Sequence, residues 1–176
     1  MLRLCGIFYL LNIVNSNQML GPADLIFQRL EYCDGAENVI KASVVSKKYN
    51  RTHFALDIAV DTPHSLGDQT EIELKGSTYK DGGWKPGSFY LKQKDVCETL
   101  KSLLGDAFVA LINSAGSNDC PFPEGQHSVS DVAFDNDKFN VPAMYGDNKM
   151  EAYITIEDEI LACFIAYYEL IPKNQF

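Results

Sequence analysis

The chain has 176 residues, of which 46% are hydrophobic, and its formal net charge at pH 7 is −9. This length suits one domain with a sizeable hydrophobic core. The negative charge argues against a nucleic-acid partner, because affinity for phosphate backbones is supplied by Lys and Arg side chains.

The N-terminal segment has the pattern of a secretory signal peptide over residues 1–16. An apolar run (LCGIFYLLNIV, 4–14) follows the positive charge of Arg3, and the small residue Ser16 stands where a signal peptidase prefers to cut. A membrane anchor is the alternative, but a span needs about 20 apolar residues. We therefore expect a secreted, extracellular protein whose mature chain is a single domain over residues 17–176.

The cysteines indicate disulfide bonds rather than a metal site. Removal of the signal peptide would take away Cys5 and leave an even number of cysteines in an oxidising compartment, so we expect two disulfides with three possible pairings. Metal-ligand spacings such as C-x-x-C and H-x-x-x-H do not occur. We expect neither a metal nor a cofactor. The remaining cysteines are Cys33, Cys97, Cys120 and Cys163.

Alternation of apolar and polar residues predicts strands through the first half of the mature chain. Candidate strands occupy residues 24–33 and 38–46, and the period of two is clear in residues 53–60 (HFALDIAV) and 71–75 (EIELK). Between them, Asn50 begins an Asn-Arg-Thr glycosylation sequon. If the sequon is used, Asn50 lies in an exposed turn of a secreted protein.

A helix interrupts the strand pattern within about residues 95–112. Asp95 and Glu98 have the spacing of a capping box, and the first turn carries Cys97. Apolar residues then recur at helical intervals. These residues are Val96, Leu100, Leu103 or Leu104, and Phe108. We expect one short amphipathic helix.

The sequence CPFPEG (residues 120–125) predicts a stiff corner after this helix. Proline donates no backbone hydrogen bond and disfavours helical geometry in the residue before it, so the run is neither a helix interior nor a central strand. The corner should release the chain into a further strand. Phe122, between the two prolines, is a candidate for contact with a ligand.

The C-terminal part of the chain predicts a β-hairpin. Residues 149–157 (KMEAYITIE) alternate, whereas residues 159–171 (EILACFIAYYELI) are apolar on both faces over most of their length. The second run should be a central strand, although periodicity alone leaves a helix open. Together the segments predict a mostly β protein, a β-cup or β-sandwich of antiparallel strands with one short helix.

Catalytic motifs are absent from the sequence. There is no G-x-S-x-G, no glycine-rich phosphate loop and no H-E-x-x-H. The acidic residues Asp131, Asp135 and Asp137 lack the glycine and the distal glutamate of a calcium loop, so we expect a solvated turn there. We therefore expect no enzymatic activity.

Aromatic and apolar residues in expected loops point to ligand binding. Trp84 lies in a glycine-rich loop or sheet edge, Phe134 and Phe139 flank the acidic turn, and residues 142–146 (PAMYG) form an apolar loop. Apolar side chains on several loops of a β-cup would form the mouth of a ligand cavity. The alternative is that these rings simply cover the ends of a filled core.

Three stretches resemble the GM-two ganglioside activator group of the ML (lipid-recognition) superfamily. Residues 118–171 share a Cys-Pro-Phe-x-Glu-Gly corner, a strand, a proline-containing apolar loop and a final hairpin that carries the last cysteine. Upstream, EYCDGAENVIKASVV resembles the opening Cys-Asp strand, and DVCETLKSLL resembles the cysteine-bearing helix. The resemblance covers about residues 31–171. Insect chemosensory proteins of the CheA and CheB groups are similar in overall style.

The resemblance implies a β-cup around an apolar cavity for lipid chains, without catalysis. It also implies two disulfides, Cys33 with Cys163 and Cys97 with Cys120. The activator carries further cysteines that this chain lacks, so its ganglioside specificity is not implied. Pro142, Met144 and Tyr145 match the loop at the family's cavity mouth. The candidate ligand-binding residues are Phe54, Leu56, Ile58, Ile72, Leu74, Trp84, Phe89, Leu91, Phe122, Met144, Tyr145, Ile154 and Ile156.

Two functional hypotheses follow. The first is a secreted carrier for a hydrophobic ligand, such as a lipid, a fatty-acyl chain or a hydrocarbon, with a chemosensory role and transient membrane contact. The second is a secreted accessory protein with a filled cup that docks on a receptor or an enzyme through an apolar rim loop. A cavity between the sheets favours the first hypothesis, and a packed interior favours the second.

Overall fold

The computed structural model describes residues 23–49, 54–134 and 144–173. The predictions for the signal peptide and for part of the loops lie outside these ranges and stay predictions. They concern residues 1–16, Asn50, Asp135, Asp137, Phe139 and Pro142.

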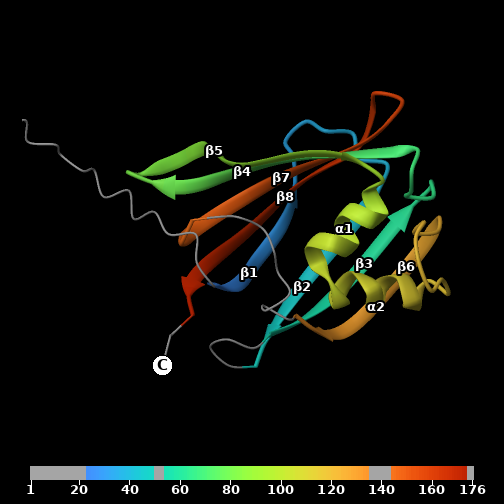
Figure 1. Ribbon diagram of the computed structural model, residues 1–176, viewed down its shortest axis with the longest axis horizontal. Helices are drawn as coiled ribbons and strands as arrows, with labels where there is room; N and C mark the ends of the chain where they lie inside the picture. The colour runs from blue at the N-terminus through green and yellow to red at the C-terminus, as the bar shows by residue number, and fades with distance from the viewer. Residues whose placement is uncertain (1–22, 50–53, 135–143, 174–176) are drawn as a thin grey trace, which may run out of the picture.

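The described strands form two antiparallel sheets (Figure 1), which confirms the predicted mostly β architecture. One sheet has the order β1-β8-β7-β4-β5, and the other has the order β2-β3-β6. The strands are β1 (Ala23–Tyr32), β2 (Lys41–Lys48), β3 (Phe54–Thr62), β4 (Thr70–Lys80), β5 (Gly83–Lys94), β6 (Gly125–Ala133), β7 (Gly146–Ile156) and β8 (Glu159–Pro172).

The expected C-terminal hairpin is formed by β7 and β8. The helix alternative for residues 159–171 is wrong, because β8 is a strand paired with β1 on one side and with β7 on the other. The hairpin turns at Glu157 and Asp158, whose φ angles are 47° and 69°. Left-handed backbone at both central residues is typical of the tight turns whose twist matches that of the strands.

The expected single helix is instead two helices, α1 (Val96–Leu104) and α2 (Asp106–Ser114). They are separated by Gly105, whose φ of 55° and ψ of −131° suit a residue without a side chain. The predicted cap is confirmed, since the Asp95 carboxylate accepts a hydrogen bond from the backbone N–H of Glu98 at 3.0 Å. The apolar repeat through Phe108 therefore runs across a bend rather than along one helix.

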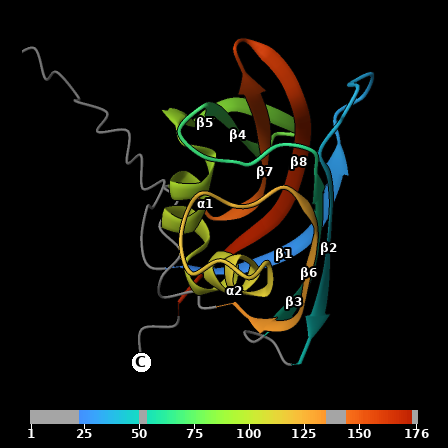
Figure 2. The same ribbon diagram turned by 90° about the vertical axis from the view of Figure 1, so that its right-hand side faces the viewer.

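The helices join the open edges of the two sheets. α1 packs against β4 and β5, whereas α2 packs against β6. Figure 2 shows both helices on one side of the molecule and β2 on the opposite side, where β1 approaches it. The sheets and the helices thus surround the interior like the walls of a cup.

Two disulfides fix this arrangement, and they have the pairing that the resemblance implies. Cys33 pairs with Cys163 on β8, and Cys97 in the first turn of α1 pairs with Cys120 of the CPFPEG corner. The bonds link residues 130 and 23 positions apart. Closing loops of such lengths stabilises a fold by about 3 to 5 kcal/mol each in the chain-entropy model.

Candidate functional site

An apolar cavity of about 240 Å³ lies inside the cup. Among the described residues, those that line it are all Ala, Val, Leu, Ile, Met, Phe or Tyr, and none of them is charged. Water in such a space would find few hydrogen-bond partners, because a stable buried water needs two to four of them. The cavity therefore suits an apolar occupant.

The two sheets supply facing walls because each strand alternates and turns its apolar side chains inward. On the five-stranded sheet the wall comes from β1, β4, β7 and β8, and on the three-stranded sheet it comes from β2 and β3. The β4 and β7 residues of the first wall are Ile72, Leu74, Met150, Ala152 and Ile154. The second wall consists of Ala42, Val44, Leu56, Ile58 and Val60.

The helices and the CPFPEG corner form a third wall. Phe122 is fully buried, and its ring lies 6.0 Å from that of Phe108 on α2, centroid to centroid. The backbone N–H of Phe122 donates to the carbonyl oxygen of Leu66 at 3.0 Å, and the reciprocal bond is 2.8 Å long. The corner is thus fastened to the segment before β4. The helix residues on this wall are Leu100, Leu103, Leu104, Ala107, Phe108 and Leu111.

Small side chains leave much of the space open. Ala152 on β7 pairs with Phe164 on β8, and Ala166 on β8 pairs with Met150 on β7, so a small residue stands beside a large one on each strand. Ala152 and Ala166 both border the cavity. Their methyl groups cannot reach the facing sheet, and a void remains between the larger neighbours.

The structure brings part of the predicted ligand-binding set together at the cavity. The predicted residues that line it are Leu56, Ile58, Ile72, Leu74, Phe122 and Ile154.

Other predicted residues lie beside the cavity rather than on its wall. Phe54 is buried in a neighbouring cluster and stacks on Phe134, with 5.3 Å between the ring centroids. Phe89 and Leu91 lie on the edge strand β5, and they pack, as Ile156 does, against the main core cluster.

The two described residues of the predicted rim loop precede β7 and are half-buried. Tyr145 packs against the cluster that contains Phe54, and the sulfur of Met144 lies 3.3 Å from the Lys80 Nζ. Neither residue borders the cavity.

Trp84 lies on the outer face of the five-stranded sheet, at the start of β5. Its ring makes edge-to-face contacts with the rings of Tyr79 and Tyr167, whose centroids lie 5.3 Å and 5.8 Å from that of Trp84. Cations cover this cluster, since the Arg29 guanidinium lies 3.7 Å from the Tyr167 ring centroid and the Lys149 ammonium lies 5.7 Å from that of Trp84. The ring is thus a surface feature, 37% exposed, and not a cavity residue.

Sequence reasoning missed the helix leucines and several residues of β8 as cavity residues. Leu100, Leu103 and Leu104 recur at helical spacing, which is the same signal as ordinary packing of a helix on a core. Tyr168 on β8 also lines the cavity, and burial raises its pKa to about 12. Its hydroxyl therefore stays neutral at physiological pH.

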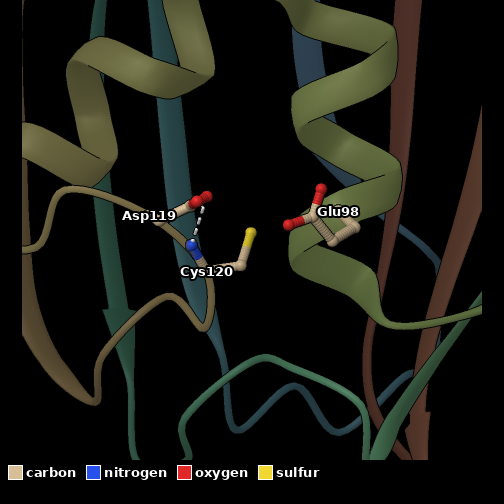
Figure 3. A group of neighbouring side chains, drawn as sticks. All are labelled: Glu98, Asp119 and Cys120. Atoms are coloured by element: carbon tan, nitrogen blue, oxygen red, sulfur yellow. Dashed lines mark hydrogen bonds between the residues drawn. The ribbon is translucent and has the colours of Figure 1, made fainter.

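Glu98, Asp119 and Cys120 lie close together near the first turn of α1 (Figure 3), but they do not form a metal site. The Cys120 sulfur is bonded to Cys97, so it has no thiolate to offer. The Lys101 ammonium lies 3.5 Å from a Glu98 carboxylate oxygen and also donates to Asp119. That hydrogen bond, with a second from the Cys120 backbone N–H, lowers the pKa of Asp119. An ion pair already occupies the place of a cation.

Asp131 of the expected acidic turn belongs to β6 and to a side-chain network on the outer face of the three-stranded sheet. Its carboxylate accepts from the Tyr49 hydroxyl, and its backbone N–H donates to the Asp57 carboxylate at 2.9 Å. Asp57 also pairs with the Lys47 ammonium at 2.8 Å. These contacts connect β2, β3 and β6.

Within the parts of the chain that the structure describes, no helix has the length and apolar character to cross a membrane.

Comparisons with known proteins give distant structural likenesses. No protein-family model matches the chain, and no curated protein matches its sequence. Among solved structures, the chain is similar to chicken MD-1 complexed with lipid IVa, with a TM-score of 0.40 and 14% sequence identity. The alignment covers 83% of this chain and 90% of that chain. A likeness at this level identifies no function, so the function has to be inferred from the residues of the cavity itself.

Proposed function

We propose that this protein is a non-enzymatic carrier that binds a hydrophobic molecule, with the apolar part of the ligand in the cavity between the sheets. One observation carries the proposal, namely an apolar space of about 240 Å³ walled by both sheets and both helices. An engineered apolar cavity of about 150 Å³ is large enough to hold benzene. A larger space of the same character can take a more extended hydrocarbon group.

The lining also indicates the class of ligand. Burial of an unpaired charge in an apolar site is strongly unfavourable, and none of the described lining residues carries a charge that could pair with one. A carboxylate or phosphate head group would therefore remain at the surface while the chain enters. Fatty-acyl chains and hydrocarbons fit this requirement.

The binding energy would come from the removal of apolar surface from water. A chain that buries about ten methylene groups would gain about 8 kcal/mol, at about 0.8 kcal/mol each. Association costs at least about 4 kcal/mol in lost freedom of motion. The net affinity should accordingly depend strongly on how many methylene groups the cavity accepts.

We propose further that the carrier acts outside the cell. The two disulfides support this, because such bonds persist in oxidising compartments. The predicted signal peptide and sequon point the same way. A chemosensory role stays a prediction that rests on the resemblance to the insect proteins alone.

The proposal is tested with mature protein produced in an oxidising host. We expect it to displace a fluorescent fatty-acid probe and to release an apolar molecule that mass spectrometry identifies. The variant Ala152→Phe places a ring in the cavity and should weaken probe binding about tenfold or more. The matched control is Ala59→Phe, because Ala59 is exposed on the outer face of β3. Failure of the wild-type protein to bind any lipid probe would reject the carrier.

A second candidate is an accessory protein that docks on a partner through the outer face of the five-stranded sheet. The aromatic cluster there favours it, since aromatic residues are enriched at interfaces. Tyr79 and Trp84 are exposed, and Trp84 also contacts the half-buried Tyr167. Photo-crosslinking from position 84 on intact cells tests this candidate. A cross-link to one receptor or enzyme that disappears in the Tyr167→Ala variant would support this candidate. If the protein forms no cross-link on cells, the candidate is rejected.

A further inference from the structure

The side chains that line the cavity belong to two core clusters or pack against them, so we describe the cavity in two parts, called compartments here. The helix-side compartment is bordered by α1, α2 and the corner, including Leu103, Phe108 and Phe122. The strand-end compartment is bordered by Leu25 and Tyr168 of the second cluster and by side chains packed against that cluster. The latter are Phe27, Val44 and Phe134.

Ile58 and Met150 stand where the two compartments meet. Both side chains line the cavity, and both pack against the main core cluster and against the second cluster. Ile58 belongs to β3 of the three-stranded sheet, and Met150 belongs to β7 of the five-stranded sheet. Ile58 and Met150 therefore mark the boundary between the two parts of the cavity, one residue from each sheet, and we call this boundary the waist.

The Ile58 side of the waist is stiff. Ile58 is β-branched, which restricts its first side-chain torsion. Its strand neighbours are Val44 on β2 and Val129 on β6, which are also β-branched. Three adjacent branched side chains leave Ile58 little freedom to move aside.

The Met150 side is adaptable. Met150 is unbranched, with three rotatable bonds, and its strand neighbours are Gly76 on β4 and Ala166 on β8. The space above Gly76 is already occupied, because a Cβ atom there would lie 2.8 Å from the Cβ of Phe89. Ala166 borders the cavity and carries only a methyl group. Met150 can therefore shift toward Ala166.

We propose that Met150 is the movable side of this waist and sets how far the apolar chain of a ligand passes from one compartment into the other. The inference rests on the proposed carrier function and names the residue that determines its chain-length specificity. A chain that ends within one compartment leaves Met150 in place. A longer chain must displace the thioether, which reduces the gain from each further methylene group.

The test measures affinity for a series of saturated fatty acids by competition with a fluorescent probe. For fatty acids too short to reach Met150, each added methylene group should tighten binding about fourfold, which corresponds to about 0.8 kcal/mol. At the chain length that reaches Met150, the plot of log Kd against length should bend and flatten. The position of this bend is the measured quantity.

Two substitutions should move the bend in opposite directions. Met150→Ala widens the waist, so the steep part should extend to longer chains. Met150→Phe narrows it, so the bend should come at a shorter chain. The matched control is Met144→Ala, which shortens a methionine outside the lining and should leave the bend in place.

Each outcome separates this inference from the carrier function. A bend at the same length in wild type and Met150→Ala overturns the role of Met150 while the carrier stands. If Met150→Phe does not fold, as a thermal melt would show, Met150→Ala decides alone. If the wild-type protein binds no fatty acid of any length, the carrier function itself fails, and the waist fails with it.

Discussion

The two faces of the five-stranded sheet are made from the same strands in opposite ways. On the outer face, charged and aromatic side chains contact one another across strands, as Arg29 does with Tyr167 and Lys92 does with Glu71 at 2.7 Å. On the inner face, apolar residues such as Ala152 and Ile154 face a space that they do not fill. Paired polar side chains close one surface, and mixed large and small apolar side chains leave the other open. A ligand would therefore bury most apolar surface at the inner face.

The largest expected effect concerns the cavity that the inner face borders. Phe122→Ala removes a fully buried ring from the cavity wall, and we expect the free energy of unfolding to fall by about 3 to 5 kcal/mol. The outer-face control is Tyr90→Ala, where the side chain is 61% exposed and the loss should stay near 0.5 kcal/mol. Urea unfolding measures both losses of stability, and equal losses would contradict the contrast between the cavity wall and the outer face of the sheet.

The next effect concerns the polar end of the inner face. Asn148 is buried, donates to the carbonyl oxygens of Met144 at 2.7 Å and Gly146 at 2.8 Å, and accepts from the Thr78 hydroxyl at 2.8 Å. Asn148→Leu leaves these groups unpaired and should cost about 1 to 3 kcal/mol. Thermal or urea unfolding checks the loss. An unchanged stability would mean that water replaces the amide and that this end is open to solvent.

Filling the void should change the free energy of unfolding by a smaller amount and in the opposite direction, since it should stabilise the protein. Ala166→Val adds methyl groups next to Met150 at the cavity wall and should raise stability slightly, by up to about 1 kcal/mol, while weakening probe binding. Calorimetry and the probe assay measure the two quantities. A variant that loses stability without any change in binding would indicate that the site is already filled by side chains.

The smallest effect is expected on the outer face of the other sheet. A hydrogen bond from Lys47 and one from the Asp131 backbone hold the pKa of Asp57 below its usual value. A carboxyl whose pKa is lowered by folding stabilises the folded protein at pH values above its pKa in the unfolded chain. This stabilisation is lost as the pH falls through its pKa in the folded protein. Because Asn does not titrate, the Asp57→Asn variant should lose slightly less stability than the wild type when the pH is lowered from neutral to pH 2. Melting temperatures between neutral pH and pH 2 test this, and identical profiles would contradict it.

The sequence predicted most of the strands and the last hairpin, because alternation is a local signal. It did not predict β5 (Gly83–Lys94) as a strand, because β5 begins in a glycine-rich stretch. Residues 159–171 were recognised as a central strand from apolar residues on both faces, and the Asp95 cap was visible in the capping-box spacing. The break at Gly105 was missed, because the apolar repeat continues in register across it.

The cavity itself could not be predicted from the pattern of residues. Leucines that line a void and leucines that fill a core have the same spacing and chemistry, so Leu103 and Leu104 were not distinguished from packing residues. The outcome depends on two long-range facts. The helices α1 and α2 pack at the edges of different sheets, and Ala152 and Ala166, on neighbouring strands, both border the space between the sheets. Neither fact is encoded in a single segment.

The central claim is that an apolar chain lies inside the cup, and a crystal structure with a fatty acid brominated at its terminal carbon tests it most directly. The anomalous signal of bromine locates the end of the chain without reference to the protein atoms. We predict a bromine peak inside the cavity, within contact distance of Met150 or of the α1 leucines. A peak on the outer surface, or crystals with side chains in the cavity and no bound chain, would contradict the account.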